Sequence, residues 1–391
     1  MTVRRIYLDH TSGMPLDPRV VDAMTPYFDR VYGNPSSPHS FGNEARRAME
    51  DARGQVAALI GAEAREVLFT SGGTESNNLA IQGVALRNRS RGTHIITSAI
   101  EHMSVINPCQ ALSKQGFQIT SIPVDSYGVV DVDALRAALT DHTILVSIMY
   151  ANNEIGTIQP ISAISEVVHA QGSLLHVDAV AAAGQIPIAV QVDAIDLLSL
   201  SSNDLYGPRG VGALYVKAGT RIQPIVQGGG QERGLRSGTE NVAGIVGMGA
   251  AADVAQRELS QDAARLVGLR DRLIHGLVDA IPEAYLNGHP TQRLPNNVNV
   301  RFNYIEGESL LLSLDMEGVA ASSGSACASK TLEPSHVLLA TGLKHEEAHG
   351  SLLMTLGRQN IVDDVDHVVE VMPSIVKRLR AISPLTPKEL M

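Results

Sequence analysis

Short aliphatic runs alternate with amphipathic stretches along the first two thirds of the chain. Between about residues 45 and 255, polar or glycine-containing turns and segments of helical periodicity separate these runs. The strands expected from them are 65–70, 93–97, 117–122, 143–149, 174–177 and 197–200. Such alternation predicts an α/β fold in which helices cover both faces of a mostly parallel sheet.

From about residue 256 the pattern changes to a long helix, strands at 297–302 and 352–356, and a closing helix from about residue 362. We therefore expect two domains in a chain that is long enough for both. The large domain is expected to span residues 14–255. Residues 1–13 together with 256–391 are expected to form a smaller α+β domain, and residues 383–391 a loose tail.

Composition excludes several classes of function. The net charge is −10 and no basic stripe is visible, which argues against nucleic acid as a partner. No apolar stretch approaches the length of a membrane span, and residues 1–9 are too charged for a signal peptide. Two cysteines in 391 residues make no disulfide framework. These features favour a cytoplasmic protein.

The unusual polar residues follow the expected strands, where open α/β sheets bind their ligands. The Gly-rich turn Ser71–Thr74 follows the first strand and offers free backbone N–H groups to a phosphate, although a plain βα turn has the same sequence features. His102 follows the second strand, where a structural role is the more common one. Asp178 follows another strand and would either pair with a protonated ring nitrogen or cap a helix.

Taken together, these segments resemble the cysteine desulfurases of the NifS/IscS type. The resemblance covers about residues 7–379, with matching motifs at 34–39, 70–78, 101–102, 152–156, 176–179, 206–213, 228–241 and 323–327. It implies the pyridoxal-phosphate-dependent transferase fold, like that of aspartate aminotransferase, with a seven-stranded sheet in the large domain, and a homodimer. Such enzymes remove sulfur from L-cysteine and leave alanine and a persulfide on a loop cysteine. The sulfur then passes to an IscU-like scaffold protein for iron–sulfur cluster assembly.

The resemblance also implies a phosphate-binding set. Gly73, Thr74 and Ser201 match residues that contact the cofactor phosphate, and the neighbouring Asn203 occupies a further phosphate-contact position. Thr239 matches a residue that reaches in from the second subunit. The cleft is therefore expected at a subunit interface.

Other roles follow from the resemblance for the rest of the site. His102 matches the imidazole that stacks on the cofactor ring, and Asp178 matches the acid that keeps the ring nitrogen protonated. Asn153 matches a contact to cofactor and substrate. Cys327, in a segment of small residues, matches the cysteine that carries the persulfide; a buried structural cysteine is the alternative.

Four positions depart from the family pattern. Asp204 stands in place of the lysine that forms the Schiff base, and a carboxylate cannot form one. Asn203 replaces a phosphate-binding histidine, and Ala181 replaces a glutamine that contacts the ring hydroxyl. Leu353 replaces the arginine that grips the substrate carboxylate, a role that Arg358 could partly take over.

Two functions remain open from the sequence. In the first, the protein is the homodimeric partner of an IscU-like scaffold, its pyridoxal-phosphate chemistry is impaired or absent, and sulfide is supplied directly. Cys327 then serves as persulfide carrier or as a ligand to a [2Fe–2S] cluster. In the second, the protein is an active desulfurase that uses noncovalently bound pyridoxal phosphate. The four departures favour the first, and a new reaction at Asp204 is a third alternative.

Overall fold

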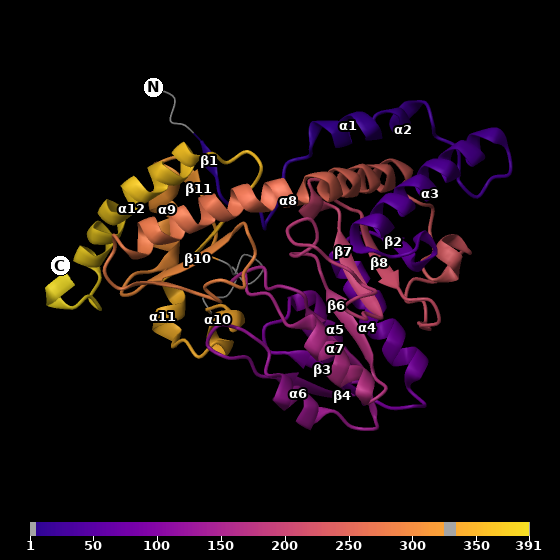
Figure 1. The fold of residues 1–391 in the computed structure, drawn as a ribbon, viewed down its shortest axis with the longest axis horizontal. Helices are drawn as coiled ribbons and strands as arrows, with labels where there is room; N and C mark the ends of the chain where they lie inside the picture. Colours follow the sequence, from indigo (N-terminus) through magenta and orange to yellow (C-terminus); the bar gives the residue numbers. More distant parts are fainter. Residues whose placement is uncertain (1–4, 324–333, 391) are drawn as a thin grey trace.

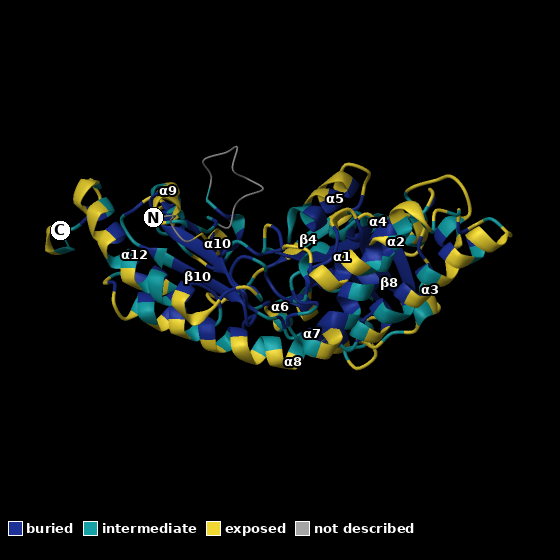
Figure 2. Cartoon of the chain, turned by 90° about the horizontal axis from the view of Figure 1, so that it is seen from above, coloured by how far each residue is buried: buried dark blue, intermediate teal, exposed yellow. Residues whose placement is uncertain are grey.

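The chain folds into two lobes that one long helix connects. A computed structural model describes residues 5–323 and 334–390. Helix α8 (Val242–Val278) runs without interruption along both lobes (Figures 1 and 2). We call the part built on a seven-stranded sheet the large lobe and the part built on a three-stranded sheet the small lobe.

The large lobe contains the mostly parallel sheet expected from the sequence. In spatial order its strands are β2 (Val67–Thr70), β8 (Gly212–Val216), β7 (Leu197–Ser201), β6 (Leu174–Asp178), β5 (Thr143–Met149), β3 (His94–Ser98) and β4 (Gln118–Ile122). Only β8 runs antiparallel to its neighbours, β2 and β7. The other adjacent strands are parallel, which confirms the predicted fold class. Strand β8 was missed from the sequence.

Helices cover both faces of this sheet. On one face pack α3 (Ser40–Ile60) and the first half of α8, together with α6 (Val132–Ala138) and α7 (Ile161–Ala170). On the other face lie α4 (Gly73–Asn88) and α5 (Met103–Ser113). The short helices α1 (Pro18–Met24) and α2 (Pro26–Asp29) pack beside α8.

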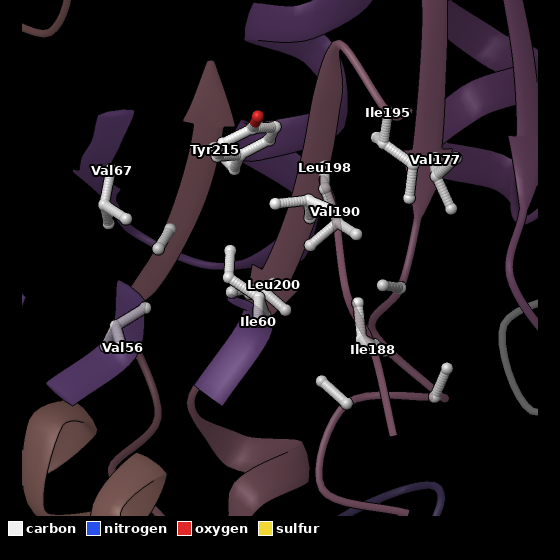
Figure 3. Close-up of a cluster of buried hydrophobic side chains, with 14 of the residues drawn as sticks. Val56, Ile60, Val67, Val177, Ile188, Val190, Ile195, Leu198, Leu200 and Tyr215 are labelled. Atoms are coloured by element: carbon white, nitrogen blue, oxygen red, sulfur yellow. The ribbon is translucent and has the colours of Figure 1, made fainter. Parts of the chain in front are cut away.

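The strands carry continuous aliphatic runs because both faces are buried. All seven residues of β5 are buried. Figure 3 shows how strand side chains meet α3 and the chain segment before β7; the labelled members are Val56, Ile60, Val67, Val177, Ile188, Val190, Ile195, Leu198, Leu200 and Tyr215. Each such aliphatic side chain contributes about 1.5–3 kcal/mol on burial. This core holds the carboxyl ends of the central strands at one edge of the sheet.

The small lobe is built on three antiparallel strands in the order β12 (Ser351–Thr355), β10 (Asn297–Phe302) and β9 (Ala284–Leu286). The N-terminal strand β1 (Ile6–Tyr7) joins it by pairing with β11 (Val319–Ala320). Its helices are α9 (Gly307–Met316), α10 (His336–Ala340), α11 (His345–His349) and α12 (Val362–Ile382). The second half of α8 packs on this lobe through Leu266, Leu273 and Leu277.

Two expectations about element boundaries are wrong. Helix α8 begins at Val242 rather than near residue 256, with the Asn241 side chain accepting the backbone N–H of Gly244 as its cap. Residue 255 therefore lies inside a helix, and a domain boundary at that position stays a prediction. The expected loose tail includes the buried Thr386 and a short 3₁₀ helix, Lys388–Leu390. Within the described ranges, no helix has the length and apolar character needed to cross a membrane.

Candidate functional site

A cleft with a volume of about 380 Å³ lies at the carboxyl ends of β5, β6 and β7, where the N-terminus of α4 also points. Its size is typical of small-molecule sites. The described residues that line it are Thr11, Ser12, Gly73, Thr74, Asn77, His102, Ser104, Met149, Ala151, Asn153, Asp178, Val180, Ala181, Ser201, Asn203 and Asp204. A larger hollow of about 590 Å³ lies in the small lobe between α11 and the end of α12. It includes no carboxyl end of the large sheet, so the cleft is the candidate site.

The Gly-rich turn Ser71–Thr74 gives the cleft an anion-binding end. Gly72 has φ +149°, a conformation that favours glycine, and α4 starts directly after it without a side-chain cap. A Cβ on Gly73 would lie 2.6 Å from a methyl group of Val180, so the backbone approaches the cleft wall closely. The first-turn N–H groups of the helix have no partners within it, and Thr74 and Ser201 add hydroxyl groups. This end suits a phosphate group.

Asp178 forms the floor of the cleft at the end of β6. Its side chain is buried and accepts hydrogen bonds from Asn77 Nδ2 at 2.7 Å and from the backbone N–H of Val180 at 3.0 Å. Burial raises the pKa of Asp178, while these two donors and the nearby His102 act in the opposite direction. Among the described residues that line the cleft there is no lysine or arginine. The acid is therefore available to a cationic group of a ligand.

A chain of hydrogen bonds connects His102 with Asp178. His102 caps α5, and its Nδ1 accepts the backbone N–H of Ser104 at 3.1 Å and lies 2.7 Å from Ser104 Oγ. Because Nδ1 accepts the backbone N–H, the neutral ring carries its proton on Nε2. Ser104 Oγ in turn accepts Asn77 Nδ2 at 2.7 Å. Sequence reasoning missed Asn77 and Ser104, although both lie within or beside the motifs at 70–78 and 101–102.

Asp204 occupies the short 3₁₀ helix Asn203–Leu205 that follows β7, and both Asn203 and Asp204 line the cleft. Burial, reinforced by the charge of Asp178, raises the pKa of Asp204 to about 7. Hydrogen bonds from Ser201 and Asn203 oppose that increase. The cleft therefore holds two carboxyl groups whose ionised forms are both disfavoured by their surroundings.

Asn153 enters the cleft on a tight turn after β5. The turn is fixed because Asn152 Oδ1 accepts the backbone N–H groups of Glu154 and Ile155, each at 2.9 Å. From the small lobe, Asn297 Nδ2 donates to the backbone oxygen of Asn153 at 3.1 Å. Asn153 therefore stands where the two lobes meet at the cleft.

The two remaining positions that were expected to depart from the family pattern, Ala181 and Leu353, differ in location. Ala181 lines the cleft, so its small side chain leaves space there. Leu353 lies on β12, is 2% exposed, and its backbone pairs with Ser322 in both directions, at 2.7 and 3.0 Å. It is not among the described residues that line the cleft.

Arg358 does not take over binding of the substrate carboxylate. Its guanidinium lies 4.7 Å over the Tyr206 ring and donates to Asp17 and Asp262 at 3.1 and 2.7 Å. A third carboxylate, Glu258, lies 3.5 Å away. These acids hold the guanidinium in place, and Arg358 is not among the described residues that line the cleft. The expectation that Arg358 takes over the role of the replaced arginine is therefore wrong.

The structure does not bring Thr239 to the cleft of its own chain. Thr239 is exposed on the loop 228–240. The loop is fixed to the large lobe by a buried pair, Arg53 with Glu232, and by Arg236, whose Nε lies 2.9 Å from Glu75 Oε1 on the first turn of α4.

Cys327 lies outside the described residues. Within the described part of the chain, no three His, Cys, Asp or Glu side chains gather as a metal site.

Glu101, which precedes His102 in the chain, is buried and is expected to make stability depend on pH. Its Oε1 accepts Ser98 Oγ at 2.5 Å and the backbone N–H of Met149 at 2.9 Å, but its Oε2 has no partner. Burial raises the pKa of Glu101 to about 8. The folded protein therefore holds this proton more tightly than the unfolded chain, and stability falls as the pH rises from the ordinary pKa of 4.5 to about 8.

We expect Glu101→Gln to reduce this loss of stability. One proton corresponds to about 1.4 kcal/mol per pH unit, so the slope of unfolding free energy against pH should decrease by up to that amount. Urea denaturation between pH 5 and 8 measures it, with the exposed Glu44→Gln as the matched control. A slope that is the same in Glu101→Gln and the control would refute a protonated Glu101.

Comparison with known proteins places the chain in a family. Residues 6–368 match the family described as aminotransferase class-V. The chain belongs to the class-V aminotransferase family. It is 58% identical over 379 residues to cysteine desulfurase IscS 1 of Archaeoglobus fulgidus, covering 97% of this chain and 99% of the relative. It is 54% identical to cysteine desulfurase IscS of Methanosarcina thermophila over 386 residues, covering 99% and 95% of the two chains.

A solved structure supports the same family at the level of the fold. A NifS-like protein superposes with a TM-score of 0.90 at 38% identity, covering 96% of this chain and all of the other. In this class-V chain, the residues fit the family cofactor, pyridoxal phosphate, in part. The Gly-rich turn fits the phosphate, and the buried Asp178 fits a protonated ring nitrogen. The carboxyl group of Asp204 does not fit the aldehyde, which needs an amine for covalent attachment.

Proposed function

We propose that this class-V protein acts in iron–sulfur cluster assembly as the homodimeric partner of an IscU-like scaffold, without desulfurating L-cysteine at an enzymatic rate. Cys327 would serve as persulfide carrier or as a ligand to a [2Fe–2S] cluster. The observation that carries the proposal is the carboxyl group of Asp204 in the cleft, at the position that matches the family's lysine. The similarity to relatives named cysteine desulfurase IscS supports a function in sulfur chemistry.

The residues of the cleft are suited to hold pyridoxal phosphate noncovalently. When bound, the cofactor supplies an electron-withdrawing ring that stabilises negative charge beside a substrate amine. Gly73, Thr74 and Ser201 would bind its phosphate, and Asp178 would hold its ring nitrogen protonated. His102 presents Nε2–H, because Ser104 occupies Nδ1. Asp204 can hold or accept a proton near neutral pH, but it cannot bond covalently to the cofactor.

Contacts to an amino-acid substrate are also reduced. Ala181 offers no hydrogen bond, and Leu353 is an apolar side chain buried on β12. Each lost polar contact removes about 1–3 kcal/mol of binding. Weak retention of both cofactor and cysteine would leave sulfide as the direct sulfur source, and Cys327 would then act as a thiolate ligand to the cluster, because sulfide alone forms no persulfide. The retained Asp178, His102 and Gly-rich turn instead favour the second candidate, a desulfurase with noncovalently bound pyridoxal phosphate.

Thr239 supports the homodimer. It is exposed on a loop that is fixed to the large lobe and does not line its own cleft, as expected for a residue that serves a second copy. A cytoplasmic location also remains a prediction.

The test of the proposal uses the two cysteines. Cys327→Ser is expected to abolish cluster sharing when a cysteine-rich scaffold is loaded from ferric iron and sulfide. Absorption of the assembled cluster and co-elution with the scaffold measure the effect. Cys109→Ala is the matched control, because Cys109 is buried and its pKa is raised to about 12 by burial, so its thiol is unreactive. Full cluster assembly with Cys327→Ser would refute the role of Cys327.

A further inference from the structure

The cleft combines groups of opposite chemistry. The N-terminus of α4, a 16-residue helix with the Gly-rich turn in front of it, borders the cleft. Asp178 and Asp204 line the same cleft, and Ser201 hydrogen-bonds to the carboxyl group of Asp204. A complementary ligand therefore carries both a phosphate and positively charged nitrogen.

Asn77 is a buried polar residue that lines the cleft and holds one of its two acids in place. Its side chain is fully buried and lines the cleft. Both hydrogen bonds of its Nδ2 are used, one to Ser104 Oγ and one to Asp178 Oδ2, each at 2.7 Å. Its Oδ1 has no partner. A buried acceptor without a donor costs about 1–3 kcal/mol.

We infer that the cleft binds the amine form of the cofactor, pyridoxamine 5′-phosphate, in preference to its aldehyde form, an inference that rests on the proposed function. The carboxyl group of Asp204 stands where the family's lysine would meet the cofactor aldehyde. An aldehyde oxygen is an acceptor and repels a carboxylate. An ammonium group has three donors and a positive charge, so it forms a charge-assisted hydrogen bond with the same carboxylate.

The electrostatics of the cleft support this choice. Burial raises the pKa of both Asp178 and Asp204, and the charge of Asp178 raises that of Asp204 further. No described lysine or arginine lines the cleft to balance them. Pyridoxamine phosphate would bring two positive groups, its ring N–H and its ammonium, to two acids that have no lysine or arginine partner among the described residues of the cleft. A bare metal ion fits less well, because no three metal-ligating side chains gather in the described part of the chain.

Isothermal titration of the full-length apoprotein with three ligands tests the inference. Pyridoxamine, pyridoxine and pyridoxal 5′-phosphates share ring and phosphate and differ only in an ammonium, hydroxyl or aldehyde group. The titration is made above pH 7, where most of Asp204 is ionised. We expect pyridoxamine phosphate to bind about tenfold more tightly than either of the other two.

Two neutral substitutions test whether Asp204 causes the preference for pyridoxamine phosphate. In Asp204→Asn, and in Asp204→Ser as a second neutral variant, the preference should fall to about onefold. Asp315→Asn removes an exposed carboxylate on α9 and should leave the preference unchanged. Equal or tighter binding of pyridoxal or pyridoxine phosphate to the native protein would overturn the inference. So would undetectable binding of pyridoxamine phosphate, or a preference that both neutral variants keep.

These outcomes are distinct from a failure of the proposed function. Alanine released from L-cysteine at an enzymatic rate would refute the proposed function and is measured separately. A protein that neither releases alanine nor prefers the amine form would refute the inference alone.

Discussion

Asp204→Lys is expected to convert noncovalent binding of pyridoxal phosphate into covalent attachment. The substitution removes one of the two acids of the cleft and supplies an amine that can form a Schiff base. We expect the apparent affinity for pyridoxal phosphate to rise by roughly 100-fold or more, because a covalent bond and a favourable charge are gained together. Borohydride treatment followed by mass analysis of the peptide that contains residue 204 measures the attachment.

A charge-matched control separates the two gains. Asp204→Arg brings the same positive charge but stays protonated and forms no Schiff base, so it should improve binding without a borohydride-stable product. Turnover of L-cysteine by Asp204→Lys should remain limited while Ala181 and Leu353 are unchanged. A borohydride-stable adduct in the native protein, or its absence in Asp204→Lys, would contradict the assignment of residue 204.

Glu232→Gln is expected to destabilise the protein by about 3 kcal/mol, because it removes the buried charge partner of Arg53 and leaves the guanidinium only the largely exposed Glu50, 3.2 Å away. The two side chains form a bidentate pair with both N–O distances at 2.8 Å. Glu232 Oε2 also accepts the backbone N–H of Phe69 at 2.9 Å. Both residues are only 8% exposed, so water cannot replace the lost contacts. Urea denaturation measures the change.

The control for this prediction is an ion pair at the surface. Glu63→Gln breaks the exposed pair with Arg65 and should cost less than about 1 kcal/mol. Because Glu232 also fixes the loop that carries Thr239, Glu232→Gln should weaken any contribution of that loop to a second subunit. Equal losses of stability in the two variants would show that the Arg53–Glu232 pair is not a buried anchor.

The fold followed from the sequence where burial alone decides structure. The runs at 143–149 and 297–302 became strands β5 and β10 with the predicted bounds. The first turns of α8 were missed because they contain Gly244, Gly247 and Gly249, and each glycine lowers helix propensity by about 1 kcal/mol relative to alanine. They are helical because α8 packs closely on α3. A Cβ on Gly249 would lie 2.6 Å from Ala52, a tertiary requirement that no local pattern shows.

The site was predictable only in part. The rule that ligands bind at strand carboxyl ends placed Gly73, His102 and Asp178 together, and the structure brings all three to one cleft; their roles remain predictions. Asn77 and Ser104 were missed because a neutral side chain on a helix has no sequence signature until its partners are known. Arg358 was misplaced for the same reason, since its carboxylate partners are distant in sequence.

The most direct test of the account is alanine release from L-cysteine by the purified native protein with added pyridoxal phosphate. The carboxyl group of Asp204 in the cleft predicts a rate no higher than that of pyridoxal phosphate alone. Release on the order of one alanine per second per chain, within the ordinary enzymatic range, would contradict it.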